Sequence, residues 1–99
     1  MNDRDYIYEE LSDFLGGTFH QDMETPEKAL HEFIEEAHKI CIENTINYIT
    51  AFLNSNLSTE KKEEFIEYYT DIYFPALKLA PLEWLEQTGE TLKQALKNT

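Results

Sequence analysis

Residues 25–53 read TPEKALHEFIEEAHKICIENTINYITAFL, and this stretch decides the fold class. Its opening Thr-Pro-Glu is typical of a helix N-cap, a first helical position and an acidic first turn. The apolar residues that follow recur at helical spacing: Leu30, Phe33, Ile34, Ala37, Ile42, Ile46, Ile49 and Leu53. Their face drifts in the middle, so we expect a kink or short break near Lys39–Cys41 and a stop at residues 54–56.

A helix is also predicted before this stretch. Four apolar residues fall at i, i+4, i+7 and i+8 on one helical face: Ile7, Leu11, Phe14 and Leu15. Asn2 or Asp3 can cap its start, and Gly16-Gly17 is expected to end it. The polar side carries an acidic stripe at four-residue spacing: Asp5, Glu9 and Asp13.

Two more helices are predicted in the C-terminal half. Ser58 caps the first, Pro75 ends it, and its inner side is apolar: Phe65, Ile66, Tyr69, Ile72 and Tyr73. Pro81 opens the second, in which Trp84 flanks an apolar inner face: Leu82, Leu85, Leu92, Ala95 and Leu96. Gly89 weakens the middle of this last helix by about 1 kcal/mol relative to alanine.

Signals for β-strands are poor along the whole chain. Only three Gly and three Pro interrupt the sequence, and it contains no Asn-Gly or Asp-Gly hairpin turn. The 99 residues are enough for one hydrophobic core, and no repeat or low-complexity tract divides them. We therefore predict an all-α fold, a single compact bundle of about five to six helices that forms one domain over residues 1–99.

The composition excludes several classes of protein. The chain is 41% hydrophobic and 13% aromatic, which is too apolar for a disordered protein. Charged residues and prolines interrupt the apolar stretches, so we expect no transmembrane helix and no secretory signal. Cys41 is the only cysteine and has no intrachain disulfide partner, which fits a reducing cytoplasm.

Acidic residues dominate the charge, with 20 acids against 8 Lys and Arg and a net charge of −12. Residues 1–36 hold eleven acids and two bases, a net −9, whereas residues 37–99 hold nine acids and six bases, a net −3. Such a field repels nucleic acid and anionic membranes and favours a basic partner, although it also serves solubility. We expect five carboxylates of the first two helices to bind that partner: Glu9, Asp13, Glu32, Glu35 and Glu36.

Residues capable of catalysis or metal binding do not form a complete motif. His31, Glu35 and His38 share helical spacing, and Glu35 with His38 has the Glu-x-x-His pattern of di-iron bundles, but a second such motif is missing. The two consecutive glycines lack the Lys-Ser/Thr pair of a phosphate-binding loop, and Cys41 is expected on an apolar helix face. We therefore predict no metal, no cofactor and no enzymatic activity.

Four tyrosines lie off the predicted apolar faces: Tyr6, Tyr8, Tyr48 and Tyr68. Tyrosine is enriched at the energetically dominant positions of protein interfaces, and it also packs at the rim of ordinary cores. Both roles fit the sequence. A protein with a basic surface is the class of partner that the composition favours.

Residues 11–23, LSDFLGGTFHQDM, resemble the opening signature of bacterial contact-dependent growth inhibition immunity proteins. The most specific element is the tetrapeptide Phe-His-Gln-Asp at residues 19–22, which follows an aromatic-containing helix end and two small residues. The Thr-Pro-Glu helix start and the Trp-Leu pair at residues 84–85 are also similar to that family.

The resemblance implies a small helical cytoplasmic protein that binds and blocks the toxic C-terminal domain delivered by a neighbouring cell. Many such toxins are nucleases, whose active clefts are basic because they hold phosphates, and we expect a ribonuclease. The alternative is an acidic adaptor module whose basic partner is unrelated to toxins. The oligomeric state stays open.

The resemblance also implies a structural motif made of Phe19, His20, Asp22 and Trp84. Immunity proteins that face different toxins would not need a shared toxin contact, so the motif is expected to support the fold. In the connector between two helices, Asp22 can accept backbone N–H bonds and His20 can bond a backbone carbonyl. The alternative is that His20 and Asp22 contact the toxin.

Overall fold

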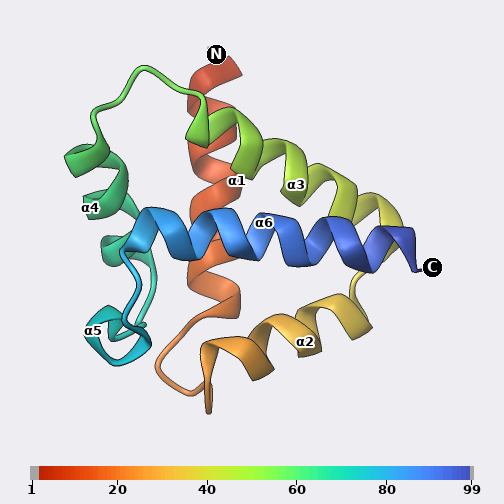
Figure 1. The fold of residues 1–99 in the computed structure, drawn as a ribbon. Coiled ribbons are helices and arrows are strands. Elements are labelled where there is room, and N and C mark those ends of the chain that lie inside the picture. The colour runs from red at the N-terminus through yellow and green to blue at the C-terminus, as the bar shows by residue number, and fades with distance from the viewer. Residues whose placement is uncertain (1–2, 99) are drawn as a thin grey trace.

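Six α-helices make up the secondary structure of residues 3–98, the part of the chain that the computed structural model describes, and no strand is present there (Figure 1). The helices are α1 (Asp3–Thr18), α2 (Pro26–Glu36), α3 (Lys39–Leu53), α4 (Thr59–Tyr69), α5 (Phe74–Leu77) and α6 (Pro81–Lys97). The predicted all-α fold class is confirmed, and the Cα radius of gyration is 12.9 Å. No helix among these residues is long and apolar enough to cross a membrane.

Three helix starts lie where the sequence predicts them. The hydroxyls of Thr25 and Ser58 each accept a hydrogen bond from the N–H three residues later, at 3.0 and 3.2 Å, so both residues are N-caps. Pro81 is the first residue of α6. Of the two residues expected to cap α1, Asp3 is helical and Asn2 lies outside the described residues.

The prediction that the glycine pair at residues 16–17 ends the first helix is wrong. α1 continues through both glycines to Thr18, and the N–H of Phe19 still donates to the Leu15 carbonyl at 2.9 Å. The Phe19 side chain is completely buried. Burial of a phenylalanine contributes about 1.5–3 kcal/mol, which offsets the roughly 1 kcal/mol that each helical glycine costs relative to alanine.

The predicted interruption within residues 25–53 is present, although it lies slightly earlier than Lys39–Cys41. Ala37 and His38 separate α2 from α3, and their ψ angles of 144° and 153° are those of extended backbone. Because these two residues are not helical, the apolar face of α2 does not continue in register into α3. α3 ends directly before residues 54–56, as predicted.

The fourth helix is shorter than predicted. α4 stops before Thr70, whose hydroxyl donates to the Ile66 carbonyl at 2.9 Å. Pro75 therefore does not end this helix, because it lies inside the separate short helix α5. Tyr69 and Tyr73, predicted on the inner side, are exposed, and Tyr73 has 73% of its surface accessible. The chain turns after α4, so helical spacing no longer sets the direction of the side chains that follow.

The core is one cluster of buried side chains to which all six helices contribute. α6 runs across the molecule and packs against α3, α4 and α2, while α1 packs against α2, α3 and α4 (Figure 1). Trp84, predicted only to flank the inner face of α6, is itself buried. Its ring centroid lies 4.8 Å from that of Phe19 and 5.6 Å from that of Phe74. Aromatic contacts thus join the end of α1 to α5 and α6.

Gly89 brings α3 and α6 into close contact. A Cβ atom at this position would lie 3.4 Å from Cγ2 of Ile49, which is itself buried. This is an ordinary van der Waals distance, so a methyl group fits here, whereas a larger side chain would have to displace Ile49.

We expect Phe19→Ala to lower the free energy of unfolding by about 3–5 kcal/mol, because it removes a completely buried ring. That loss is a large part of the roughly 5–15 kcal/mol that stabilises a domain. Urea unfolding followed by circular dichroism measures the change. Tyr68→Ala is the control, since this ring is 81% exposed, and it should cost less than about 1 kcal/mol. Equal losses in the two variants would contradict the central place of Phe19.

Candidate functional site

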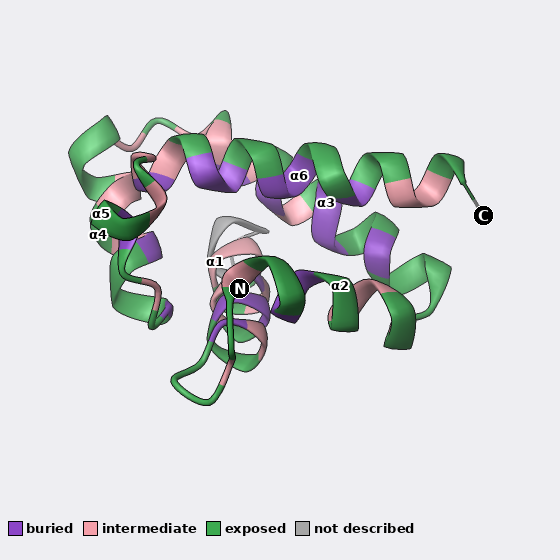
Figure 2. Cartoon of the chain, turned by 60° about the horizontal axis from the view of Figure 1, so that its bottom comes forward, coloured by how far each residue is buried: buried purple, intermediate pink, exposed green. Residues whose placement is uncertain are grey.

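The five carboxylates expected to bind a partner lie on two helices that pack against each other. We call them the acidic surface: Glu9 and Asp13 on α1, and Glu32, Glu35 and Glu36 on α2. All five side chains are exposed, and Figure 2 shows exposed positions along the outer side of α2. Among the side chains of residues 6–98 none of the five forms an ion pair, although Glu32 is close enough to Lys28 to interact with its charge.

A cavity of about 360 Å³ opens beside the acidic surface, where the chain turns between α1 and α2. Four carboxylates line this connector cavity: Asp22 and Glu24 from the connector, and Glu32 and Glu36 from α2. The chain thus gathers negative charge from two segments around one hollow. Such a hollow favours a positively charged group.

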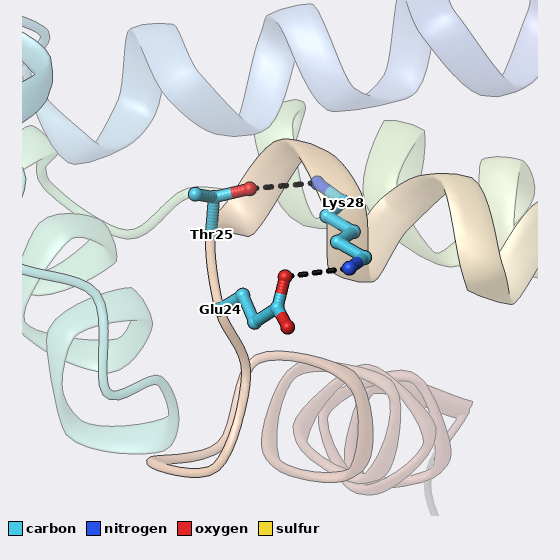
Figure 3. Close-up of polar contacts among 3 residues, drawn as sticks. All are labelled: Glu24, Thr25 and Lys28. Carbon is cyan, nitrogen blue, oxygen red and sulfur yellow. Dashed lines mark hydrogen bonds and ion pairs between the residues drawn. The ribbon is translucent and has the colours of Figure 1, made fainter.

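Among the described residues, Lys28 is the only Lys or Arg that lines the connector cavity, and it already forms an ion pair. Its Nζ donates to the carboxylate of Glu24 (Figure 3). This hydrogen bond and the charge of Lys28 lower the pKa of Glu24, and Glu24 in turn raises the pKa of Lys28. The pair is exposed and stabilises the fold only weakly. Lys28 also interacts with the charge of Glu32, more weakly than with Glu24.

A second hollow, of about 590 Å³, lies between α1 and the start of α3, and we call it the α1–α3 groove. Glu10 and Asp13 line it from α1. Its aromatic lining comes from three helices: Phe14, Phe33 and Tyr48. Thr18 and Phe33 line both the groove and the connector cavity, so the two hollows are neighbours.

Tyr48 joins the wall of the groove to α1. Its hydroxyl lies 3.2 Å from that of Tyr6, and the two rings meet edge to face with centroids 5.9 Å apart. The hydrogen bond with Tyr6, followed by desolvation, raises the pKa of Tyr48 to about 12. The raised pKa keeps the Tyr48 hydroxyl protonated further into the alkaline range than that of an ordinary tyrosine.

The residues of the expected structural motif divide into two pairs. Phe19 and Trp84 lie in the core, in contact with each other. His20 and Asp22 are exposed and line the connector cavity. Nδ1 of His20 accepts a hydrogen bond from the Asp22 N–H at 3.2 Å.

The sequence analysis did not identify Glu10 or the start of α3 as parts of the candidate site. Glu10 shares a helical face with Asp13 and Phe14, three and four residues later, and this spacing was the available signal. Cys41, expected on an apolar face, is exposed, because the break before α3 changes the helical phase. Ile40 beside it is 70% exposed, and both residues line the groove.

The histidines and glutamate with metal-like spacing do not form a site. His31 and Glu35 lie on α2, whereas His38 lies in the break and is the N-cap of α3. Among the side chains of residues 6–98, no group of three His, Cys, Asp or Glu is arranged to hold a metal ion.

A family model described as CdiI immunity protein matches residues 7–92, which include both hollows and the acidic surface. The chain belongs to the CdiI immunity protein family. The resemblance carried by residues 11–23 and 84–85 is thereby confirmed. No curated protein and no solved structure gives a significant match.

Membership of the family defines the general role of the chain. A CdiI immunity protein neutralises a toxin of contact-dependent growth inhibition. Members of the family are typically inhibitors without enzymatic activity. The chemistry to be explained is therefore the binding of a toxin.

Tyr6→Phe should alter the stability of this CdiI immunity protein at alkaline pH. The pKa of Tyr48 is raised from 10.0 to about 12 in the folded chain. This contributes stability that is fully present below pH 10 and is lost as the pH rises through about 12. The variant lacks the hydroxyl that causes most of the shift, so thermal stability should fall more steeply in the parent than in the variant across this range. Parallel pH profiles would contradict the coupling, and Tyr68→Phe is the control.

Proposed function

We propose that this CdiI immunity protein inhibits a nuclease toxin, specifically a ribonuclease, by covering the toxin's basic cleft with the acidic surface. One observation carries the proposal: five exposed carboxylates, none of them in an ion pair among the described side chains, lie beside a cavity lined by carboxylates. A surface of this kind binds basic proteins and repels their nucleic acid substrates.

Charge complementarity supports a nuclease as the toxin. A nuclease must hold phosphates, so its active cleft presents lysine and arginine side chains. Residues 1–36 carry a net −9 of the total −12, which concentrates the field on α1 and α2. Attraction between complementary fields raises association rates by roughly 10- to 1,000-fold. Rapid capture matters because free toxin continues to cleave its substrate.

Inhibition by occlusion requires no cofactor and no catalytic group. We infer that residues 1–99 act as one domain and bind the toxin domain directly, without nucleic acid or membrane. We expect the immunity protein to bind the toxin domain in the cytoplasm, because a delivered ribonuclease finds its RNA substrate there.

Three reversals on α2, Glu32→Lys, Glu35→Lys and Glu36→Lys, should slow association with the toxin domain encoded next to this chain's gene. We expect about a tenfold or greater decrease in the association rate at low salt and a flatter salt dependence, because the steering charge is reversed. Stopped-flow fluorescence measures the rate, and circular dichroism verifies the helix content.

The matched control makes the same charge change on α4, where Glu60, Glu64 and Glu67 are also exposed. Both triple variants have a net charge six units more positive than the parent. A clearly smaller effect of the α4 variant places the binding charge on α1 and α2. Equal effects would show that total charge, and not the acidic surface, governs association.

The nuclease assignment has its own test. The purified toxin domain should cleave RNA, and an equimolar amount of this CdiI immunity protein should stop the cleavage. A toxin domain that binds the chain but leaves both RNA and DNA intact would contradict the nuclease assignment.

A further inference from the structure

We propose that the α1–α3 groove receives an arginine side chain of the toxin and that this contact limits dissociation of the complex. The inference rests on the proposed function, because it specifies how a basic toxin is held. The groove encloses about 590 Å³, which lies within the range of sites that accept small ligands.

The lining of the groove combines carboxylates with aromatic rings. Glu10 and Asp13 lie one turn apart on α1 and offer two carboxylates. Phe14, Phe33 and Tyr48 line the same hollow with aromatic rings. An occupant must therefore combine an apolar stem with a cationic end, as lysine and arginine side chains do.

The charge in the groove is uncompensated. Among the described side chains no cation pairs with Glu10 or Asp13, and Glu10 is half-buried. Of the described residues that line the groove, His38 is the one basic residue. The two carboxylates therefore favour a cation in the groove.

Arginine fits this lining better than lysine. Its planar guanidinium stacks on aromatic rings and forms paired hydrogen bonds with carboxylates, and it is more weakly hydrated than an ammonium group. Ile40, which is 70% exposed, and Cys41 add an apolar margin that a bound toxin would cover. Arginine anchors in desolvated pockets dominate the energy of many protein interfaces.

The two groove carboxylates, Glu10 and Asp13, then have a different kinetic role from the carboxylates of the acidic surface that lie outside the groove. Exposed charges at the edge of an interface chiefly change the association rate, whereas an enclosed, hydrogen-bonded charge pair changes the dissociation rate. This difference separates the present inference from the proposed function.

Asp13→Asn and Glu64→Gln form a matched pair of variants for this test. Each removes one negative charge from an exposed helical position, but only Asp13 lines the groove, and Glu64 lies on α4, outside the acidic surface. We expect Asp13→Asn to speed dissociation from the toxin domain at least about tenfold and Glu64→Gln by no more than about twofold. Equal dissociation rates in the two variants would overturn the groove as the anchor.

Cys41 reports whether the groove is covered, since it is the only cysteine of the chain and lines the groove. Iodoacetamide should modify Cys41 in the free protein and react at least about tenfold more slowly in the toxin complex. The control is Thr50→Cys in a Cys41→Ser background, because position 50 is exposed on the opposite side of α3. Toxin binding with undiminished reactivity at Cys41 would refute the groove and leave the proposed function standing.

The identity of the occupant is tested from the toxin side. Each arginine of the toxin domain is replaced by lysine and by alanine, and each variant is combined with Asp13→Asn in a double-mutant cycle. We expect one arginine whose two replacements both weaken binding and whose effect largely disappears in the Asp13→Asn background. If lysine serves equally well, or if no arginine is coupled to Asp13, the arginine proposal is wrong.

Discussion

The burial of Phe19 fixes the part of the molecule on which the candidate site depends. Its ring meets Phe14 and Trp84, with centroid distances of 5.6 and 4.8 Å, and its carbonyl accepts the N–H of Asp71 at 2.8 Å. One residue thus ties the end of α1 to α6 and to the segment that follows α4. The connector leaves this anchor to reach the Thr25 cap of α2, so the positions of Glu32 and Glu36 follow from a contact inside the core.

This arrangement separates the groups that hold the fold from those that face a partner. The carboxylates of the acidic surface are exposed and form no ion pair among the described residues, so they contribute little to packing. Their mutual repulsion opposes the compact state, as a net charge of −12 on 99 residues must. A basic partner that binds α1 and α2 would relieve this repulsion, which makes complex formation more favourable than the direct contacts alone.

Much of the fold could be predicted from local signals, because capping residues and helical spacing act within a few positions. Three helices begin at such local signals, namely the caps Thr25 and Ser58 and the first helical residue Pro81. Errors arose where a distant contact overrode the local preference: the glycine pair stays helical because the next residue enters the core, and α4 ends before the predicted proline. The apolar spacing of residues 65–73 could not show that the chain turns and leaves Tyr73 exposed.

The candidate site was predictable in the same partial way. The charge imbalance of residues 1–36 is visible in the sequence and marks α1 and α2 as the acidic helices. The groove is not visible there, because it brings Glu10 of α1 together with Phe33 of α2 and Tyr48 of α3. These side chains become neighbours only when the three helices pack together. Residue spacing within a single helix cannot predict that contact.

The location of the groove bears on how toxin specificity can be set in this fold. Its carboxylates stand on α1, while Phe14 and Phe33 have a second role, since their rings also contact each other at a centroid distance of 4.9 Å. A change at Glu10 or Asp13 therefore alters the charge offered to a partner, whereas a change at Phe14 disturbs the packing of α1 on α2. Recognition can vary through the carboxylates at small cost to stability, and the aromatic lining keeps the shape that any occupant must match.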